Sequence, residues 1–336
     1  MIRYNKAQRL LVLDNKSIGY AVYVNEAGYL ETVYFGKSLS DYSDFDSVRN
    51  AGGFATPYYD AVSGKESVYR DGFKQDCAPL EVSTHGLLDK RGAPVIIRGA
   101  NGSFATDLRF CKVSRMSGAP EPAGLPHAHG ACETADILLE DKTLRVRAHL
   151  YLTIFPDKDV IVKSFRIENA GKKAVRLVRA MSMQLDLPRA DYDLVHFHGR
   201  WAKERDYACN ALPDGVQEVS SNLGRSSAEE NPFVYLKERD ATMDCGEVIG
   251  FNLIYSGNFK FRTFVNVYRG LHILYGMNDE DFEWTLAAGE AFATPQAVIA
   301  YSAEGVDKMS QTFHRFIREN LMTYAANRDY KPVLFN

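Results

Sequence analysis

Apolar and polar residues alternate with a period of two along much of this chain. The clearest run covers residues 145–155, where every second side chain is apolar, namely Val146, Ala148, Leu150, Leu152 and Ile154. This period is typical of a strand with one buried face. Turn-forming residues occupy 156–159, and a second alternating run covers 160–167. Two strands joined by a short turn predict a β-hairpin.

Similar segments recur before and after this hairpin. Residues 19–36 predict another hairpin, whose strands are joined at 25–28, and strand-type runs continue from residue 174 to residue 302. β-Branched and aromatic residues lie between turns of Gly, Asn, Asp and Pro, and no helical pattern separates the strands. The chain is therefore predicted to be all-β, with two large antiparallel sheets packed as a sandwich.

A helical pattern is found near the C-terminus. Within residues 305–322, apolar side chains recur at spacings of three and four, at Val306, Met309, Phe313, Phe316, Ile317 and Leu321. This spacing predicts an amphipathic helix of about 17 residues. The apolar run at the end of 328–336 resembles the start of a buried strand. We expect it to open a further domain, so that the chain ends at a domain boundary.

Composition and charge limit the partners and the compartment. The formal net charge is −3 and no block of Lys and Arg occurs, so neither nucleic acid nor an anionic membrane is an expected partner. The apolar run at 10–13 is too short for a signal peptide or a membrane span, and we expect a cytoplasmic protein. The five cysteines are widely spaced and form no CxxC pair, which favours free thiols.

Two His-x-His pairs are candidate metal ligands. His127 and His129 lie in a Pro- and Gly-rich segment, whereas His196 and His198 lie in a strand pattern, where residues two apart share a face. No third ligand can be identified for either pair. Hydrogen-bonded loop histidines are the preferred interpretation, and no metal or other cofactor is predicted.

Acidic and aromatic residues offer further candidates for sugar chemistry. Four carboxylates cluster in a turn-rich segment, at Asp279, Glu280, Asp281 and Glu283, and we interpret them as a solvated loop. Trp201 and Trp284 could stack on sugar rings, but each lies in or beside a strand pattern, so core packing is the favoured interpretation. The residues alone show no recognisable catalytic group.

Several segments, in order along nearly the whole chain, resemble one family. These segments are 76–81 (DCAPLE), 100–110 (ANGSFATDLRF), 178–188 (VRAMSMQLDLP), 199–205 (GRWAKER), 231–236 (NPFVYL), 244–259 (DCGEVIGFNLIYSGNF) and 300–316 (AYSAEGVDKMSQTFHRF). Together they resemble the N-terminal domain of bacterial α-galactosidases of glycoside hydrolase family 36.

The resemblance implies a β-supersandwich of the galactose mutarotase type that supports a catalytic (β/α)₈ barrel. It divides the chain into a sandwich at 1–302, a connecting helix at 303–327 and the start of a missing barrel at 328–336. The family's catalytic aspartates lie in barrel motifs, Lys-Trp-Asp and Ser-Asp-Asn, and neither motif occurs here. The resemblance thus assigns no catalytic residue to this chain, and implies as partners its own barrel, further copies of the chain, and α-galactoside sugars.

One loop of the family is partly retained. The family's Gly-Asp-Phe-Arg loop aligns with 88–94 (LDKRGAP), which keeps Asp89 and Arg91 but has Lys90 in place of the aromatic residue. The resemblance implies a role for Asp89 and Arg91 at the substrate rim or at an interface. A structural ion pair in a tight loop is the alternative. Other departures from the family pattern are Leu80 and the stretch 228–230.

Two other functions stay open. A free-standing carbohydrate-binding or assembly module would use aromatic residues on a sandwich face. A mutarotase-like sugar epimerase would use a histidine and a carboxylate, because related sandwiches host that chemistry.

Overall fold

The computed structural model describes residues 1–45, 59–60, 65–66, 75–87, 89–227, 229–323, 333 and 335. The first strands form a four-stranded antiparallel sheet in the order β1 (Ile2–Asn5), β2 (Leu10–Asp14), β3 (Ile18–Val24) and β4 (Leu30–Lys37). The predicted hairpin at 19–36 is confirmed as β3 and β4. A short hairpin follows, formed by β5 (Tyr59–Asp60) and β6 (Lys65–Glu66).

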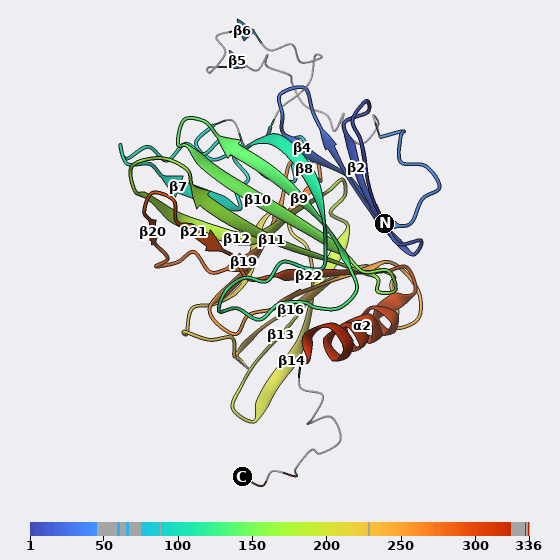
Figure 1. The fold of residues 1–336 in the computed structure, drawn as a ribbon. Coiled ribbons are helices and arrows are strands. Elements are labelled where there is room, and N and C mark those ends of the chain that lie inside the picture. The colour runs from blue at the N-terminus through green and yellow to red at the C-terminus, as the bar shows by residue number, and fades with distance from the viewer. Residues whose placement is uncertain are drawn as a thin grey trace.

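The larger part of the chain forms two antiparallel sheets (Figure 1). The ten-stranded sheet has the order β14-β13-β16-β17-β22-β11-β10-β9-β8, with β21 also paired to β11. Its strands are β8 (Arg109–Ser117), β9 (Glu133–Asp141), β10 (Val146–Ile154), β11 (Val160–Asn169), β13 (Tyr192–Arg200), β14 (Lys203–Ala211), β16 (Glu230–Glu238), β17 (Val248–Leu253), β21 (Ala291–Ala293) and β22 (Ala297–Ser302).

The six-stranded sheet has the order β15-β18-β19-β12-β20, with β7 also paired to β12. Its strands are β7 (Val95–Arg98), β12 (Val175–Leu187), β15 (Gly215–Ser221), β18 (Phe259–Val265), β19 (Leu271–Met277) and β20 (Trp284–Leu286). The expected all-β sandwich is therefore confirmed, and a separate N-terminal sheet adds to its core.

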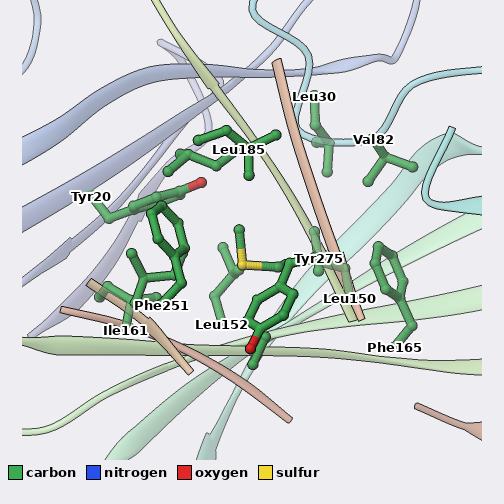
Figure 2. Close-up of a cluster of buried hydrophobic side chains, with 14 of the residues drawn as sticks. Tyr20, Leu30, Val82, Leu150, Leu152, Ile161, Phe165, Leu185, Phe251 and Tyr275 are labelled. Atoms are coloured by element: carbon green, nitrogen blue, oxygen red, sulfur yellow. The ribbon is translucent and has the colours of Figure 1, made fainter. Parts of the chain in front are cut away.

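In the central hairpin, the alternating apolar residues of the sequence are the side chains that enter the core. Strands β10 and β11 pair antiparallel from Val146 opposite Asn169 to Ile154 opposite Ile161, as expected. The five alternating apolar side chains of β10 are fully buried and belong to the main core. Figure 2 shows this core, in which side chains of both large sheets meet Tyr20 and Leu30 from the N-terminal sheet. One continuous core thus joins all three sheets.

The predicted helix is confirmed as α2 (Gly305–Phe316), which continues into a π-helical turn, η1 (Ile317–Leu321). Its apolar side packs on the outer face of the ten-stranded sheet (Figure 1). Met309 and Phe313 approach β17 where the strand has glycine, since a Cβ on Gly250 would lie 2.6 Å from the Met309 sulfur. Phe316 is fully buried, and its ring packs edge-on against Phe155, 5.3 Å between centroids.

The proposed end of the connecting segment and the start of a barrel, residues 324–332, 334 and 336, lie outside the described residues. In the part that the structure describes, no helix is long and apolar enough to cross a membrane. None of the five cysteines is joined to another in a disulfide.

Phe316→Ala tests how firmly α2 is docked. We expect the free energy of unfolding to fall by about 3–5 kcal/mol, because the substitution removes a fully buried ring from a packed cluster. Urea denaturation followed by circular dichroism measures this loss. His314→Ala, at an exposed position of the same helix, is the control and should change stability little. Equal stability losses for the two variants would contradict the docking.

Candidate functional site

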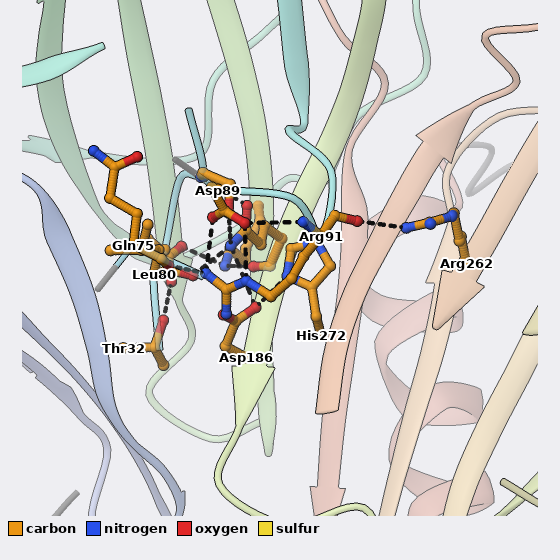
Figure 3. Close-up of polar contacts among 12 residues, drawn as sticks. Thr32, Gln75, Leu80, Asp89, Arg91, Asp186, Arg262 and His272 are labelled. Carbon is orange, nitrogen blue, oxygen red and sulfur yellow. Dashed lines mark hydrogen bonds and ion pairs between the residues drawn. The ribbon is translucent and has the colours of Figure 1, made fainter. Parts of the chain in front are cut away.

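The loop that precedes β7 carries charged side chains into the protein interior. Asp89 and Arg91 are both buried there, 8% and 4% exposed. The Arg91 guanidinium donates to both carboxylate oxygens of Asp89, from Nε at 3.0 Å and from Nη2 at 2.8 Å. Its Nη1 donates to Asp186 of β12 at 2.5 Å. Figure 3 shows the guanidinium between the two carboxylates.

Neighbouring strands extend this cluster. His272 of β19 lies opposite Asp186 in the strand register, and its Nδ1 is 2.7 Å from Asp186 Oδ1. Arg262 of β18 donates from Nη1 to the backbone carbonyl of Arg91 at 2.8 Å (Figure 3). The loop is therefore held directly to β12 and β18 of the six-stranded sheet, and β19 between them contacts Asp186.

Each charged group of this cluster stabilises the ionised form of its neighbour. Burial disfavours ionisation of Asp89, but the Arg91 charge and its hydrogen bonds outweigh burial and lower the pKa of that carboxyl. Burial also opposes the Arg91 charge, yet Asp186 and Asp89 raise the pKa of the guanidinium. Both Asp89 and Arg91 are consequently charged at neutral pH.

A second buried ion pair lies between the sheets. Lys163 of β11 is fully buried, and its ammonium contacts the Glu81 carboxylate and the backbone carbonyl of Gln184, and donates to the Tyr20 hydroxyl at 3.1 Å. The second oxygen of Glu81 accepts hydrogen bonds from Tyr20 at 2.5 Å and from Thr32 at 2.6 Å. Burial lowers the pKa of Lys163, and the Glu81 charge counteracts this effect.

The side chain of Gln184 connects the two clusters. Its Nε2 donates to the Leu80 carbonyl at 2.6 Å and to Asp186 at 3.3 Å, and its Oε1 accepts from the Ser83 backbone at 2.8 Å. A cavity of about 40 Å³ adjoins Arg91 and His272. This volume suits water and is far too small for a sugar. The network therefore favours the interpretation of Asp89 and Arg91 as a structural ion pair, while their contact with a substrate rim or an interface stays a prediction.

The four candidate histidines do not come together. His127 lies in the β8–β9 loop with Nδ1 3.3 Å from the Leu125 carbonyl. The backbone of His129 exchanges two 2.8 Å hydrogen bonds with Asn320 in η1. His196 and His198 share β13, and His196 Nδ1 is 3.3 Å from a carboxylate of β16. In the described ranges, no three His, Cys, Asp or Glu side chains are placed to hold a metal ion.

The acidic cluster divides into two parts. Glu280, Asp281 and Glu283 are exposed, as a solvated loop would have them. Asp279 differs, because its side chain is 14% exposed and pairs with Lys260 at 2.7 Å and with Arg179 at 2.5 Å. Burial works against its charge, but Arg179 and Lys260 lower the pKa of this carboxyl. Interpreting Asp279 as a solvated residue was wrong, since cations from neighbouring strands face it.

The preference for core packing of the two tryptophans was also wrong. Trp201 is 91% exposed, because it lies at the turn between β13 and β14. Trp284 is 51% exposed, because it lies on β20, a three-residue strand at the edge of its sheet. A strand pattern places a side chain on one face of a strand, but does not show whether another element covers that face.

Comparison with known proteins places this fold among glycosidases. The family model of the glycosyl hydrolase family 36 N-terminal domain matches residues 28–287, and the melibiase model matches residues 291–336. The chain thus belongs to glycosyl hydrolase family 36, and it corresponds to the N-terminal part of that family's proteins.

Individual relatives agree with this assignment. The chain is 34% identical to alpha-galactosidase Mel36A of Lactobacillus acidophilus and 35% identical to alpha-galactosidase AgaA of Geobacillus stearothermophilus, in each case over 100% of this chain and 46% of the relative. The crystal structure of alpha-galactosidase AgaB from G. stearothermophilus superposes with a TM-score of 0.92 at 33% identity, covering 99% of this chain and 45% of that one. The chain therefore spans about half the length of these relatives.

Arg91→Met tests the ionic cluster. We expect it to lower the free energy of unfolding at pH 7 by about 3–5 kcal/mol, because two buried carboxylates lose their cation. The control is Arg176→Met, which removes an exposed ion pair with Glu283 and should cost at most about 1 kcal/mol. Urea denaturation measures both losses.

The stability difference between wild type and Arg91→Met should shrink in acid. Because the folded-state pKa of Asp89 is lowered, its contribution is present above the ordinary carboxyl pKa, about 3.9, and is lost as the pH falls through the folded-state value. In the variant, Asp89 has lost its cation and is easier to protonate. Protonation at low pH removes the free-energy cost of burying its unpaired charge. A difference that stays constant from about pH 7 to about pH 3 would contradict an electrostatic role for Arg91.

Proposed function

We propose that this chain is the N-terminal, non-catalytic part of an α-galactosidase that hydrolyses terminal α-galactosides, of the melibiose and raffinose type, with retention of configuration. The observation that carries the proposal is the match of the whole chain to alpha-galactosidases of about twice its length. One solved relative, AgaA A355E D548N of G. stearothermophilus, is in complex with raffinose.

In this proposal the chain has three parts, a sandwich at 1–302, a connecting segment at 303–327 and the first residues of a catalytic barrel at 328–336. The docking of α2 on the outer face of the ten-stranded sheet supports the middle assignment, because it gives the connection a fixed direction. A retaining glycosidase needs two carboxyl groups about 5 Å apart, and the barrel would supply both. The sandwich would position the barrel and form part of its rim.

We also place the parent protein in the cytoplasm, as a homo-oligomer. In this arrangement Asp89 and Arg91 act at the rim or at an interface by fixing the course of their loop, since their own side chains are buried. The loop's backbone, not the ion pair, would then meet the substrate or the neighbouring chain.

One contact favours mutarotase-like chemistry as a second candidate function. On the outer face of the ten-stranded sheet, His149 Nδ1 lies 2.7 Å from Asp136 Oδ1, and the His149 ring stacks beside Tyr151. A histidine paired with a carboxylate can move a proton to and from a sugar hydroxyl. Polarimetry on fresh α-galactose tests this function. Mutarotation no faster than that catalysed by buffer, or equally fast with His149→Ala, would exclude it.

The primary proposal predicts that the purified chain hydrolyses no aryl α-galactoside, because the two barrel motifs are absent from its sequence. The measurement is release of the aryl group by protein purified to homogeneity. The control is the product of the complete reading frame, which should continue past Asn336 into a barrel with Lys-Trp-Asp and Ser-Asp-Asn and should be active. Turnover by the chain alone, or a reading frame without a barrel, would overturn the proposal.

A further inference from the structure

A large cavity lies at one end of the sandwich, and none of the residues of the two ionic clusters lines it. It measures about 870 Å³ and is bounded by the β8–β9 loop, by β11, β20 and β21, and by loops of the six-stranded sheet. In Figure 1, β20 and β21 lie together at this end of the molecule. Known ligand pockets have volumes of roughly 300–1,000 Å³, so this cavity has the size of a small-molecule site.

Three aromatic rings form one wall of the cavity. Trp284 packs against Phe292 with 5.4 Å between ring centroids, and Phe282 packs against Phe292 at 5.8 Å. Phe282 and Phe292 also pack against the main core. The two phenylalanines therefore anchor the wall, and the half-exposed indole of Trp284 lies on top of it.

Polar groups complete the lining. Asn258 donates from Nδ2 to Asn222 Oδ1 at 2.9 Å, and its own Oδ1 accepts from the Gly224 backbone at 2.6 Å. Asn222 is thereby held in place, and among the described residues its Nδ2 donates to no other group, so that it can donate to a ligand. Arg166 of β11 adds a partly exposed guanidinium.

The charges of the lining exclude several ligand classes. Glu121, Glu280 and Asp281 give three carboxylates against the single cation of Arg166. Phosphorylated sugars, nucleotides and other anions would be repelled. A small ammonium ion is a poor fit too, because the aromatic rings form a packed wall and do not surround one point.

A pyranose ring meets all of these requirements. One face of the ring presents C–H groups, which can stack on an exposed indole, and its edges carry hydroxyls that both donate and accept hydrogen bonds. We propose that this cavity is a binding site for a neutral oligosaccharide, with Trp284 as the stacking platform and Asn222 as a hydrogen-bond donor. The choice of an α-galactoside as the ligand rests on the proposed function, whereas the class of ligand rests on the cavity itself.

Fluorescence gives a direct test because the chain has only two tryptophans. In the Trp201→Phe variant, all tryptophan emission comes from Trp284. Titration of this variant with raffinose should give a saturable shift of the emission to shorter wavelength, since the sugar removes water from the indole. The matched variant Trp284→Phe keeps Trp201, which does not line the cavity, and its emission should not change. A lack of saturable change in Trp201→Phe would overturn the proposal.

Calorimetry with raffinose measures the contribution of each side chain. Trp284→Ala should weaken binding by about tenfold or more, because the stacking surface is lost. Trp201→Ala should bind like the wild type. Asn222→Ala changes an exposed position, leaves the aromatic wall intact and should also weaken binding. If circular dichroism shows that Trp284→Ala does not fold, the affinity of Asn222→Ala for raffinose is the test of the site. If Asn222→Ala and Trp284→Ala both bind raffinose as tightly as the wild type, the assignment is overturned. Binding of tetramethylammonium without binding of raffinose would overturn it too.

The failure of this inference can be told apart from failure of the proposed function. Raffinose binding is measured on the chain alone, where no barrel is present to bind the sugar. A complete reading frame that encodes an active α-galactosidase, together with a chain that binds no raffinose, would reject only the cavity site. Saturable binding together with a reading frame that lacks a barrel would reject only the proposed function.

Discussion

The fully buried ammonium of Lys163 is the interaction on which the assembly of this fold depends. Removing a charge from water costs several kcal/mol unless partners surround it. Here the partners come from separate parts of the chain, Tyr20 from the N-terminal sheet, Glu81 from the loop before β7, and Gln184 from the six-stranded sheet, while Lys163 itself belongs to the ten-stranded sheet. Each element satisfies the charge only when the others are in position, so the three sheets and the loop are expected to become ordered together.

The strands, the central hairpins and the helix could be predicted because their apolar periods are set by local geometry. Apolar residues at every second position predicted the buried face of β10. Apolar residues at spacings of three and four predicted the face of α2 that packs on the sheet. The same pattern contains no information on which strands lie at the edge of a sheet. For this reason Trp284 on β20 and Trp201 at a hairpin turn were assigned to the core, although both are exposed.

Only part of the candidate site could be predicted from the sequence. Asp89 and Arg91 are two positions apart and belong to the family loop, but Asp186 is 95 residues from Arg91 and meets it only when that loop folds onto β12. A signal for the second ion pair was present, because Lys163 falls on the apolar side of the run at 160–167, beside Ile161 and Phe165. A lysine at such a position requires a buried anion, yet sequence alone does not identify Glu81 as that anion.

The paired hydrogen bonds between His129 and Asn320 link two regions that are otherwise distant in sequence. The β8–β9 loop that contains His129 also supplies one side of the cavity lined by Trp284. Asn320 belongs to η1, the turn that ends the helix. The link is close, since a Cβ on Gly130 would lie 2.9 Å from the Asn320 amide. Any displacement of η1 must therefore either break both hydrogen bonds or move the β8–β9 loop with it, so the last turn of the helix and one side of the cavity are fixed relative to each other by the same two contacts.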